Sequence, residues 1–157
     1  MARAVASILG VLAVAGCGGE PTLTAVPQAT FHFDSGGAWH LQGYGAWQVE
    51  VTRAGRFTVQ HTVRDVVKDY GSLDLAPGQA RTLWAAIDAA DLPAVRVTKR
   101  SGVPDEAQLV FALSEGEALR TALSIWQNDV AEHALLRTVL DRLRALIETH
   151  HGVKPVF

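Results

Sequence analysis

Apolar and polar side chains alternate along residues 46–53 and again along residues 56–63, and the pair Ala54-Gly55 separates the two stretches. A period of two is typical of strands that bury one face. A short break that contains glycine is typical of the turn of a β-hairpin. Further stretches with strand-like patterns are residues 31–33, 71–75, 108–113 and 118–126.

Apolar residues at spacings of three and four predict two helices. The first is expected to begin at Pro77, because proline suits the first helical position, and to end before Pro93. The second is expected to open at Asp129, which with Glu132 fits a capping box, and to end near Gly152. The order strands, helix, strands, helix predicts an α+β fold. We expect a two-layer sandwich, with a mostly antiparallel sheet and both helices on one face.

The tryptophans divide into two groups by their surroundings. Trp47, Trp84 and Trp126 fall in phase with other apolar residues, so we expect them in the core. Trp39 and Tyr44 lie among glycines. They either form a contact surface, since aromatic side chains bury a large area with few torsions, or pack at the edge of the core.

The N-terminus has the features of a targeting segment. Residues 1–16 contain one positive charge, Arg3, followed by an apolar run that is shorter than the roughly 20 residues of a membrane span. The residues from Leu12 to Cys17 resemble the lipobox of bacterial lipoproteins. That resemblance implies cleavage before Cys17 and acylation of its thiol. The alternatives are an ordinary signal peptide, or a buried apolar helix with a chance cysteine.

Acylation at Cys17 implies that the lipid bilayer is a partner, because two or more acyl chains (palmitate and similar) anchor a protein stably. The expected location is the bacterial cell envelope, at the outer or the plasma membrane. Residues 1–16 are then a signal peptide and residues 17–30 a lipidated cysteine with a flexible tether. Residues 31–151 are expected to form a single α+β domain, and residues 152–157 a tail.

Composition narrows the classes of function. The chain has 157 residues, 48% of them hydrophobic, and a net charge of −2. We therefore expect a folded domain and no nucleic-acid partner, since a general nucleic-acid binder carries a basic excess. A single cysteine excludes an internal disulfide. The six histidines show no spacing typical of a metal site, and we expect no metal and no cofactor.

One group of residues superficially suggests catalysis. His32, Asp34, Ser35 and His40 lie close together in the sequence, which leaves a small hydrolase as an alternative. Asp34 and Ser35 precede two glycines, however, and in such turns these side chains commonly bind backbone amides. The local structural role is therefore the preferred interpretation, and the chain is expected not to be an enzyme.

The folded part resembles the emfourin group, which are protein inhibitors of thermolysin-like metalloproteases. The similar segments are Phe31–Gly37, Ala89–Leu92, the pair Pro104-Asp105 and the closing helix Leu136–Leu146. The resemblance implies that the loops 34–37 and 101–106 contact a protease, with a carboxylate reaching its metal-containing cleft. The chain departs from the group in its longer first hairpin and in its lipid anchor.

These observations favour a non-catalytic envelope lipoprotein whose domain binds a protein or another ligand. A membrane-tethered metalloprotease inhibitor is the more specific alternative. The partner is not identified by the sequence. The candidate binding residues are Asp34, Ser35, Gly36, Gly37, Trp39, Tyr44 and Asp105.

Overall fold

The computed structural model describes residues 28–37, 44–104 and 106–157. Within them the chain forms a six-stranded sheet and two α-helices. The strands are β1 (Ala29–Asp34), β2 (Ala46–Thr52), β3 (Arg56–Val63), β4 (Val66–Asp74), β5 (Gln108–Glu115) and β6 (Ala118–Trp126). The helices are α1 (Pro77–Ala90) and α2 (Ala134–His151), and the short 3-10 helices are η1 (Leu92–Ala94) and η2 (Gln127–Glu132).

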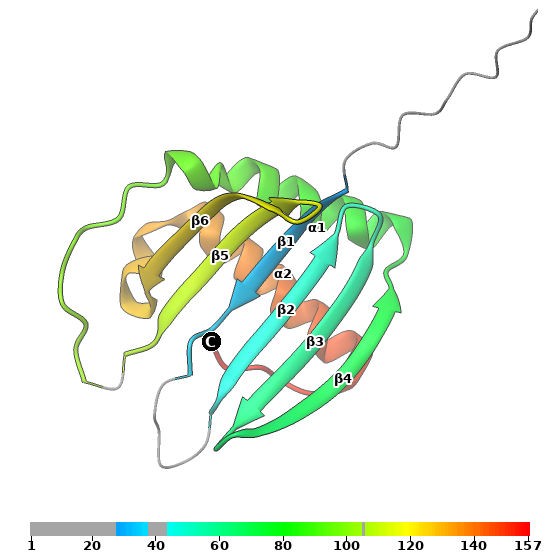
Figure 1. Cartoon of the computed structure of the whole chain (residues 1–157), viewed down its shortest axis with the longest axis horizontal. Helices are drawn as coiled ribbons and strands as arrows, with labels where there is room; N and C mark the ends of the chain where they lie inside the picture. Colours follow the sequence, from blue (N-terminus) through cyan, green and yellow to red (C-terminus); the bar gives the residue numbers. More distant parts are fainter. Residues whose placement is uncertain (1–27, 38–43, 105) are drawn as a thin grey trace, which may run out of the picture.

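The sheet has the strand order β4-β3-β2-β1-β5-β6, and all neighbouring strands are antiparallel. Figure 1 shows α1 and α2 together behind this sheet, with no helix on its other face. The predicted two-layer α+β sandwich is therefore confirmed. One face of the sheet is covered and the other is open.

The core lies between the sheet and the helices. Phe33 of β1 lies opposite Val49 of β2 on one side and Phe111 of β5 on the other, and all three are buried. From the helical layer, Leu83 of α1 and Leu143 of α2 are also fully buried. Each such side chain contributes roughly 1.5–3 kcal/mol when it leaves water, so this layer of contacts dominates the stability of the fold.

The sheet extends beyond the predicted strands at two places. β1 begins at Ala29, so two residues of the predicted tether are part of the sheet. β4 begins at Val66 rather than near residue 71, after a tight turn in which Arg64 and Asp65 both have positive φ. A bulge near Gly71 shifts the pairing of β3 with β4. This bulge breaks the two-residue period, which is why the alternation did not reveal the whole strand.

The start of α2 was predicted wrongly. Residues 127–132 form η2, and α2 begins at Ala134 with His133 as its N-cap. Asp129 does not cap this helix, because its carboxylate binds the guanidinium of Arg100. The start of α1 at Pro77 agrees with the prediction.

Two of the three predicted core tryptophans are buried. Trp47 and Trp84 are 4% and 3% exposed. Trp126 is only half-buried, and it pairs with Gln108 on the open face of the sheet. Leu119 of the same strand is 65% exposed, because the pairing of β5 with β6 shifts between Leu113 and Ser114.

The C-terminal residues 152–157 do not form a free tail. Pro155 and Phe157 are buried, and the ring of Phe157 lies 4.8 Å from that of Phe33. Arg144 of α2 places its guanidinium over the ring of Phe157 and donates a hydrogen bond to the backbone oxygen of that residue. This segment is therefore part of the packed domain.

Candidate functional site

The open face of the sheet contains a shallow hollow of about 300 Å³ that is lined mainly by polar residues. It lies over the central strands β1, β2, β3 and β5, where helices do not cover the sheet (Figure 1). Its lining is formed mainly by His32, Asp34, Gln48, Glu50, Thr58 and Gln60. Half-exposed hydrogen-bonding side chains at the centre of a rigid sheet can bind a polar group of a partner without rearrangement.

Charge on this face is unevenly distributed over strands β1 to β4. The register places Asp34, Glu50, Asp69 and Asp74 on the same face as the lining of the hollow. Among the described residues of these four strands, the register places a single Arg or Lys side chain on the open face, that of Arg56. Its guanidinium lies 3.7 Å from a carboxylate oxygen of Asp74. The open face therefore presents an excess of negative charge to its surroundings.

His32 lies at the centre of the hollow and is held by its neighbours. Its Nε2 atom is 3.1 Å from the hydroxyl of Ser114. Its Nδ1 atom is 3.5 Å from a carboxylate oxygen of Glu50 on the adjacent strand. Both side chains remain about half exposed, so this contact is available to solvent and to a partner.

The loop that follows β1 has a structural role. The hydroxyl of Ser35, which is 3% exposed, accepts a hydrogen bond from the backbone N–H of Trp47 at 2.7 Å. The carboxylate of Asp34 accepts one from the backbone N–H of Gly36 at 2.7 Å and one from the Gln48 amide at 3.0 Å. His32 contacts Ser114 and Glu50 rather than Ser35. The described residues therefore bring no histidine to the Ser35 hydroxyl.

Gly36 is required by close packing as well as by its backbone conformation. Its φ is +51°, a region that side chains disfavour. A Cβ atom at this position would lie 2.2 Å from the backbone oxygen of Gln108. The loop 34–37 is thereby pressed against the start of β5, directly after the second candidate loop, 101–106. Both loops lie at the same end of the sheet (Figure 1).

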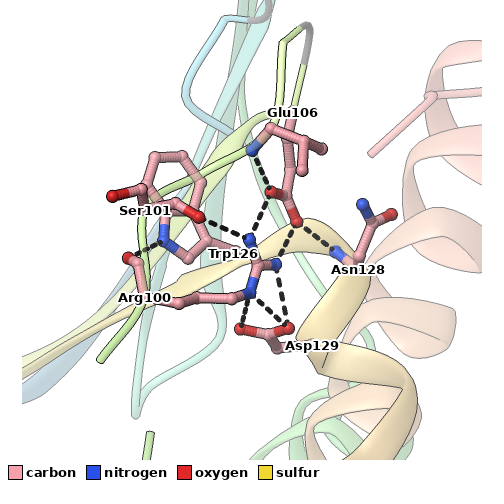
Figure 2. Close-up of polar contacts among 7 residues, drawn as sticks. Arg100, Ser101, Glu106, Trp126, Asn128 and Asp129 are labelled. Carbon is pink, nitrogen blue, oxygen red and sulfur yellow. Dashed lines mark hydrogen bonds and ion pairs between the residues drawn. The ribbon is translucent and has the colours of Figure 1, made fainter. Parts of the chain in front are cut away.

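Within the loop 101–106, residues 101–104 and 106 are described, and a buried carboxylate holds them in place. Figure 2 shows the Glu106 side chain between Arg100 and Asn128, and it is only 1% exposed. Its oxygens accept two hydrogen bonds from the guanidinium of Arg100 and one each from the backbone N–H groups of Val103 and Asn128. The hydrogen bonds from Arg100 lower the pKa of Glu106 from 4.5 to about 2. The carboxylate is therefore ionised at neutral pH.

The guanidinium of Arg100 links this carboxylate to η2. It also donates to both carboxylate oxygens of Asp129, at 2.9 to 3.0 Å. These two carboxylates raise the pKa of Arg100 well above its ordinary value. Sequence reasoning missed this group, because no local pattern connects Arg100 with a carboxylate that is 29 residues away in the chain.

The indole of Trp126 forms a floor beneath the same loop. Its Nε1–H donates to the backbone oxygen of Arg100 at 3.2 Å. A Cβ atom on Gly102 would lie 2.6 Å from the indole ring, so only glycine permits this contact. The loop is thus fixed at several points while Val103 remains exposed. The whole connection between η1 and β5, residues 95–107, has no helix or strand in its described part, and connections of about this length in a compact domain are commonly functional.

Of the other sequence-predicted site residues, Tyr44 is described and is 45% exposed. Its backbone oxygen lies 2.7 Å from Nε2 of His61, whose ring stacks on Trp47. Trp39, His40 and Asp105 lie outside the described residues. Cys17 lies outside them as well.

Neither a metal centre nor a membrane-spanning helix is found within residues 28–37, 44–104 and 106–157. No group of three or more His, Cys, Asp or Glu side chains there could hold a metal ion. No helix there is both long enough and apolar enough to cross a bilayer.

The fold and this face define a class of protein: an α+β sandwich with an open, acidic sheet face. No protein-family model matches the chain, and no curated protein matches it in sequence.

Proposed function

We propose that this protein is a bacterial envelope lipoprotein, anchored through an acylated Cys17, whose domain binds a partner without catalysis. The lipobox-like residues that end at Cys17 support the anchor. Eleven residues, 18–28, separate Cys17 from the first residue of β1. An extended segment of that length reaches at most about 40 Å, so the domain remains close to the bilayer.

The open sheet face is the proposed contact surface. The observation that carries this part of the proposal is the polar hollow at its centre, surrounded by an excess of carboxylates and left uncovered by the helices. A partner with basic side chains complements this surface. Charge complementarity of this kind accelerates association and selects against acidic partners.

The contact surface can be tested in intact cells by site-specific crosslinking. A photo-reactive amino acid in place of Thr58 reports from the hollow, and the same amino acid in place of the exposed Leu135 on α2 reports from the opposite layer. We expect a discrete protein adduct from position 58 that the additional change Glu50→Lys strongly reduces. Identical adducts from both positions, or an adduct that is insensitive to Glu50→Lys, would contradict the proposal.

The anchor has a separate test. Metabolic labelling with a palmitate analogue should label the wild-type protein, and Cys17→Ser should abolish the label and release or misprocess the protein. Equal labelling of the two proteins would show that the anchor is not at Cys17.

A membrane-tethered inhibitor of thermolysin-like metalloproteases is the second candidate function. The observation that favours it is the position of the loops 34–37 and 101–106 at one end of the sheet, where a single partner can contact both. The hydrogen bonds of Val103 to Glu106 and of Arg100 to Trp126 restrict this loop before binding, which lowers the entropy that a contact would cost. This candidate is dropped if an excess of the purified protein leaves a panel of such proteases fully active.

A further inference from the structure

A second surface lies between α1 and the turn that joins β2 to β3. It is a groove of about 550 Å³. Its apolar lining consists of the buried Leu75, Ala80 and Trp84 and the exposed Ala54, Pro77 and Ala85. Arg53 and Arg81 stand at its rim. Apolar grooves with a few polar groups at their edge are typical ligand sites.

The two arginines differ in whether their guanidinium groups already bind other side chains. The guanidinium of Arg53 lies over the indole of Trp84, 4.0 Å from the ring centre, and binds both carboxylate oxygens of Asp88. Arg81 is exposed and has no hydrogen-bond or ion-pair partner among the described residues. The groove therefore combines apolar surface with one uncommitted guanidinium, a group that suits phosphate oxygens.

The groove lies beside the point where the N-terminal segment joins the sheet. The backbone N–H of Arg53 donates to the backbone oxygen of Ala29, the first residue of β1, at 2.7 Å. Figure 1 shows the start of β1, the β2–β3 turn and α1 at the same end of the molecule. The eleven residues 18–28 connect this end to Cys17.

We propose that the groove binds the headgroup of an anionic phospholipid in the membrane that holds the chain. This inference rests on the proposed anchor at Cys17. The phosphate would bind Arg81, and the upper part of the acyl chains would lie on the exposed Ala54, Pro77 and Ala85. The neighbouring β5–β6 turn carries Glu115 and Glu117, so this end of the domain is not generally basic. The proposed contact is therefore the binding of one lipid headgroup in this groove, and not a general electrostatic attraction between the domain and an anionic membrane.

The test uses the full acylated chain in nanodiscs of phosphatidylcholine with a minor fraction of phosphatidylglycerol. A photo-reactive amino acid replaces the exposed Ala85 of the groove, and mass spectrometry identifies the lipid that it captures. We expect phosphatidylglycerol to be captured above its mole fraction. Arg81→Gln should lower this enrichment about fivefold, which is the usual effect of one basic residue at a membrane surface.

The matched control is Arg142→Gln, which removes an exposed arginine from α2 and should leave the enrichment unchanged. Capture in proportion to the mole fraction, equal effects of the two variants, or no lipid capture would overturn the proposal. Complete competition by soluble glycerol phosphate would also overturn it, because the ligand would then not be a membrane lipid. The acyl mass at Cys17 is measured in the same sample. If Cys17 carries no acyl chain while position 85 still captures phosphatidylglycerol from added vesicles, the anchor fails and the lipid site stands.

Discussion

Both carboxylate oxygens of Glu106 accept hydrogen bonds from the guanidinium of Arg100, at distances of 2.5 and 2.8 Å. This pair holds the loop 101–106 against η2 and Trp126. Because the Glu106 side chain is buried and its hydrogen bonds to Arg100 favour the charged form, protonation of this carboxylate weakens the contacts that hold the loop. The conformation of this candidate contact loop is therefore expected to depend on pH through the protonation of Glu106.

The first prediction concerns acid stability. The pKa of Glu106 is lowered from 4.5 in the unfolded chain to about 2 in the folded protein. Its contribution to stability is therefore complete above pH 4.5 and is lost as the pH falls from 4.5 towards 2. Urea unfolding between pH 6 and pH 2.5 should show this loss, and Glu106→Gln should remove that part of the pH dependence. The exposed Glu132→Gln is the control and should retain the wild-type profile.

A second prediction concerns His151 at the end of α2. Its Nε2 atom is buried and finds no hydrogen-bond partner among the residues that the structure describes, and its ring lies near Tyr70 and Phe57. Burial, followed by the nearby His150, lowers the pKa of His151 below its ordinary value of 6.5. The unfolded chain therefore binds a proton more readily than the folded one, and stability falls as the pH drops below 6.5.

The variant His151→Phe keeps an aromatic ring at this position and removes its titration. It should lack the decrease in unfolding free energy that the wild type shows between about pH 7 and pH 5. The histidine ring can also be followed directly by NMR. A pKa at or above 6.5 for His151 would contradict the prediction.

The third prediction separates steric overlap from backbone strain. Gly36 and Gly116 both have positive φ, +51° and +58°. A Cβ atom would overlap the backbone oxygen of Gln108 at position 36, whereas at position 116 it would meet nothing within 4 Å. Gly116→Ala should therefore cost about 1 kcal/mol of unfolding free energy from strain alone. Gly36→Ala should cost clearly more in urea unfolding, and equal losses would show that the loop adapts freely.

The fourth prediction concerns the C-terminal segment. Phe157 is 6% exposed and packs on Phe33, whereas Val156 is exposed. Phe157→Ala should lower the unfolding free energy by about 3 kcal/mol, because it leaves a cavity beside the central strand. Val156→Ala should change it by less than about 0.5 kcal/mol. A similar small effect of both substitutions would mean that the segment is not docked in solution.

Local patterns were sufficient for much of the fold. The alternation around residues 46–63 predicted the β2–β3 hairpin, and apolar spacing with Pro77 predicted α1. These predictions succeeded because a strand or helix with one buried face must repeat its apolar residues with its own period. Where a bulge breaks the period, as at Gly71, the strand was predicted too short.

The candidate site was only partly predictable. The sequence pointed to Asp34 and Ser35. The hydrogen bond of Asp34 to Gly36 is that of a local turn, whereas Ser35 accepts one from the backbone N–H of Trp47 on the neighbouring strand β2. The sequence contained no sign of the polar hollow, because the hollow is assembled from four strands whose register depends on the whole sheet. It likewise assigned Asp129 to a helix cap that the structure does not contain.

By itself, the sequence predicted most of the strands and helices and the turns that contain glycine, since each depends on neighbours a few residues apart. From these elements and their buried faces it also predicted the two-layer α+β class, and the targeting segment before residue 17 stays a prediction. Only the tertiary structure decided which polar side chains meet in the hollow on the open face, which carboxylate binds Arg100, and that Phe157 belongs to the core. These outcomes depend on contacts between distant residues, such as Arg100 with Asp129 and Phe33 with Phe157. Such contacts stabilise the fold only when packing removes both side chains from water. A pattern of neighbouring residues in the sequence cannot show which distant residues will meet in this way.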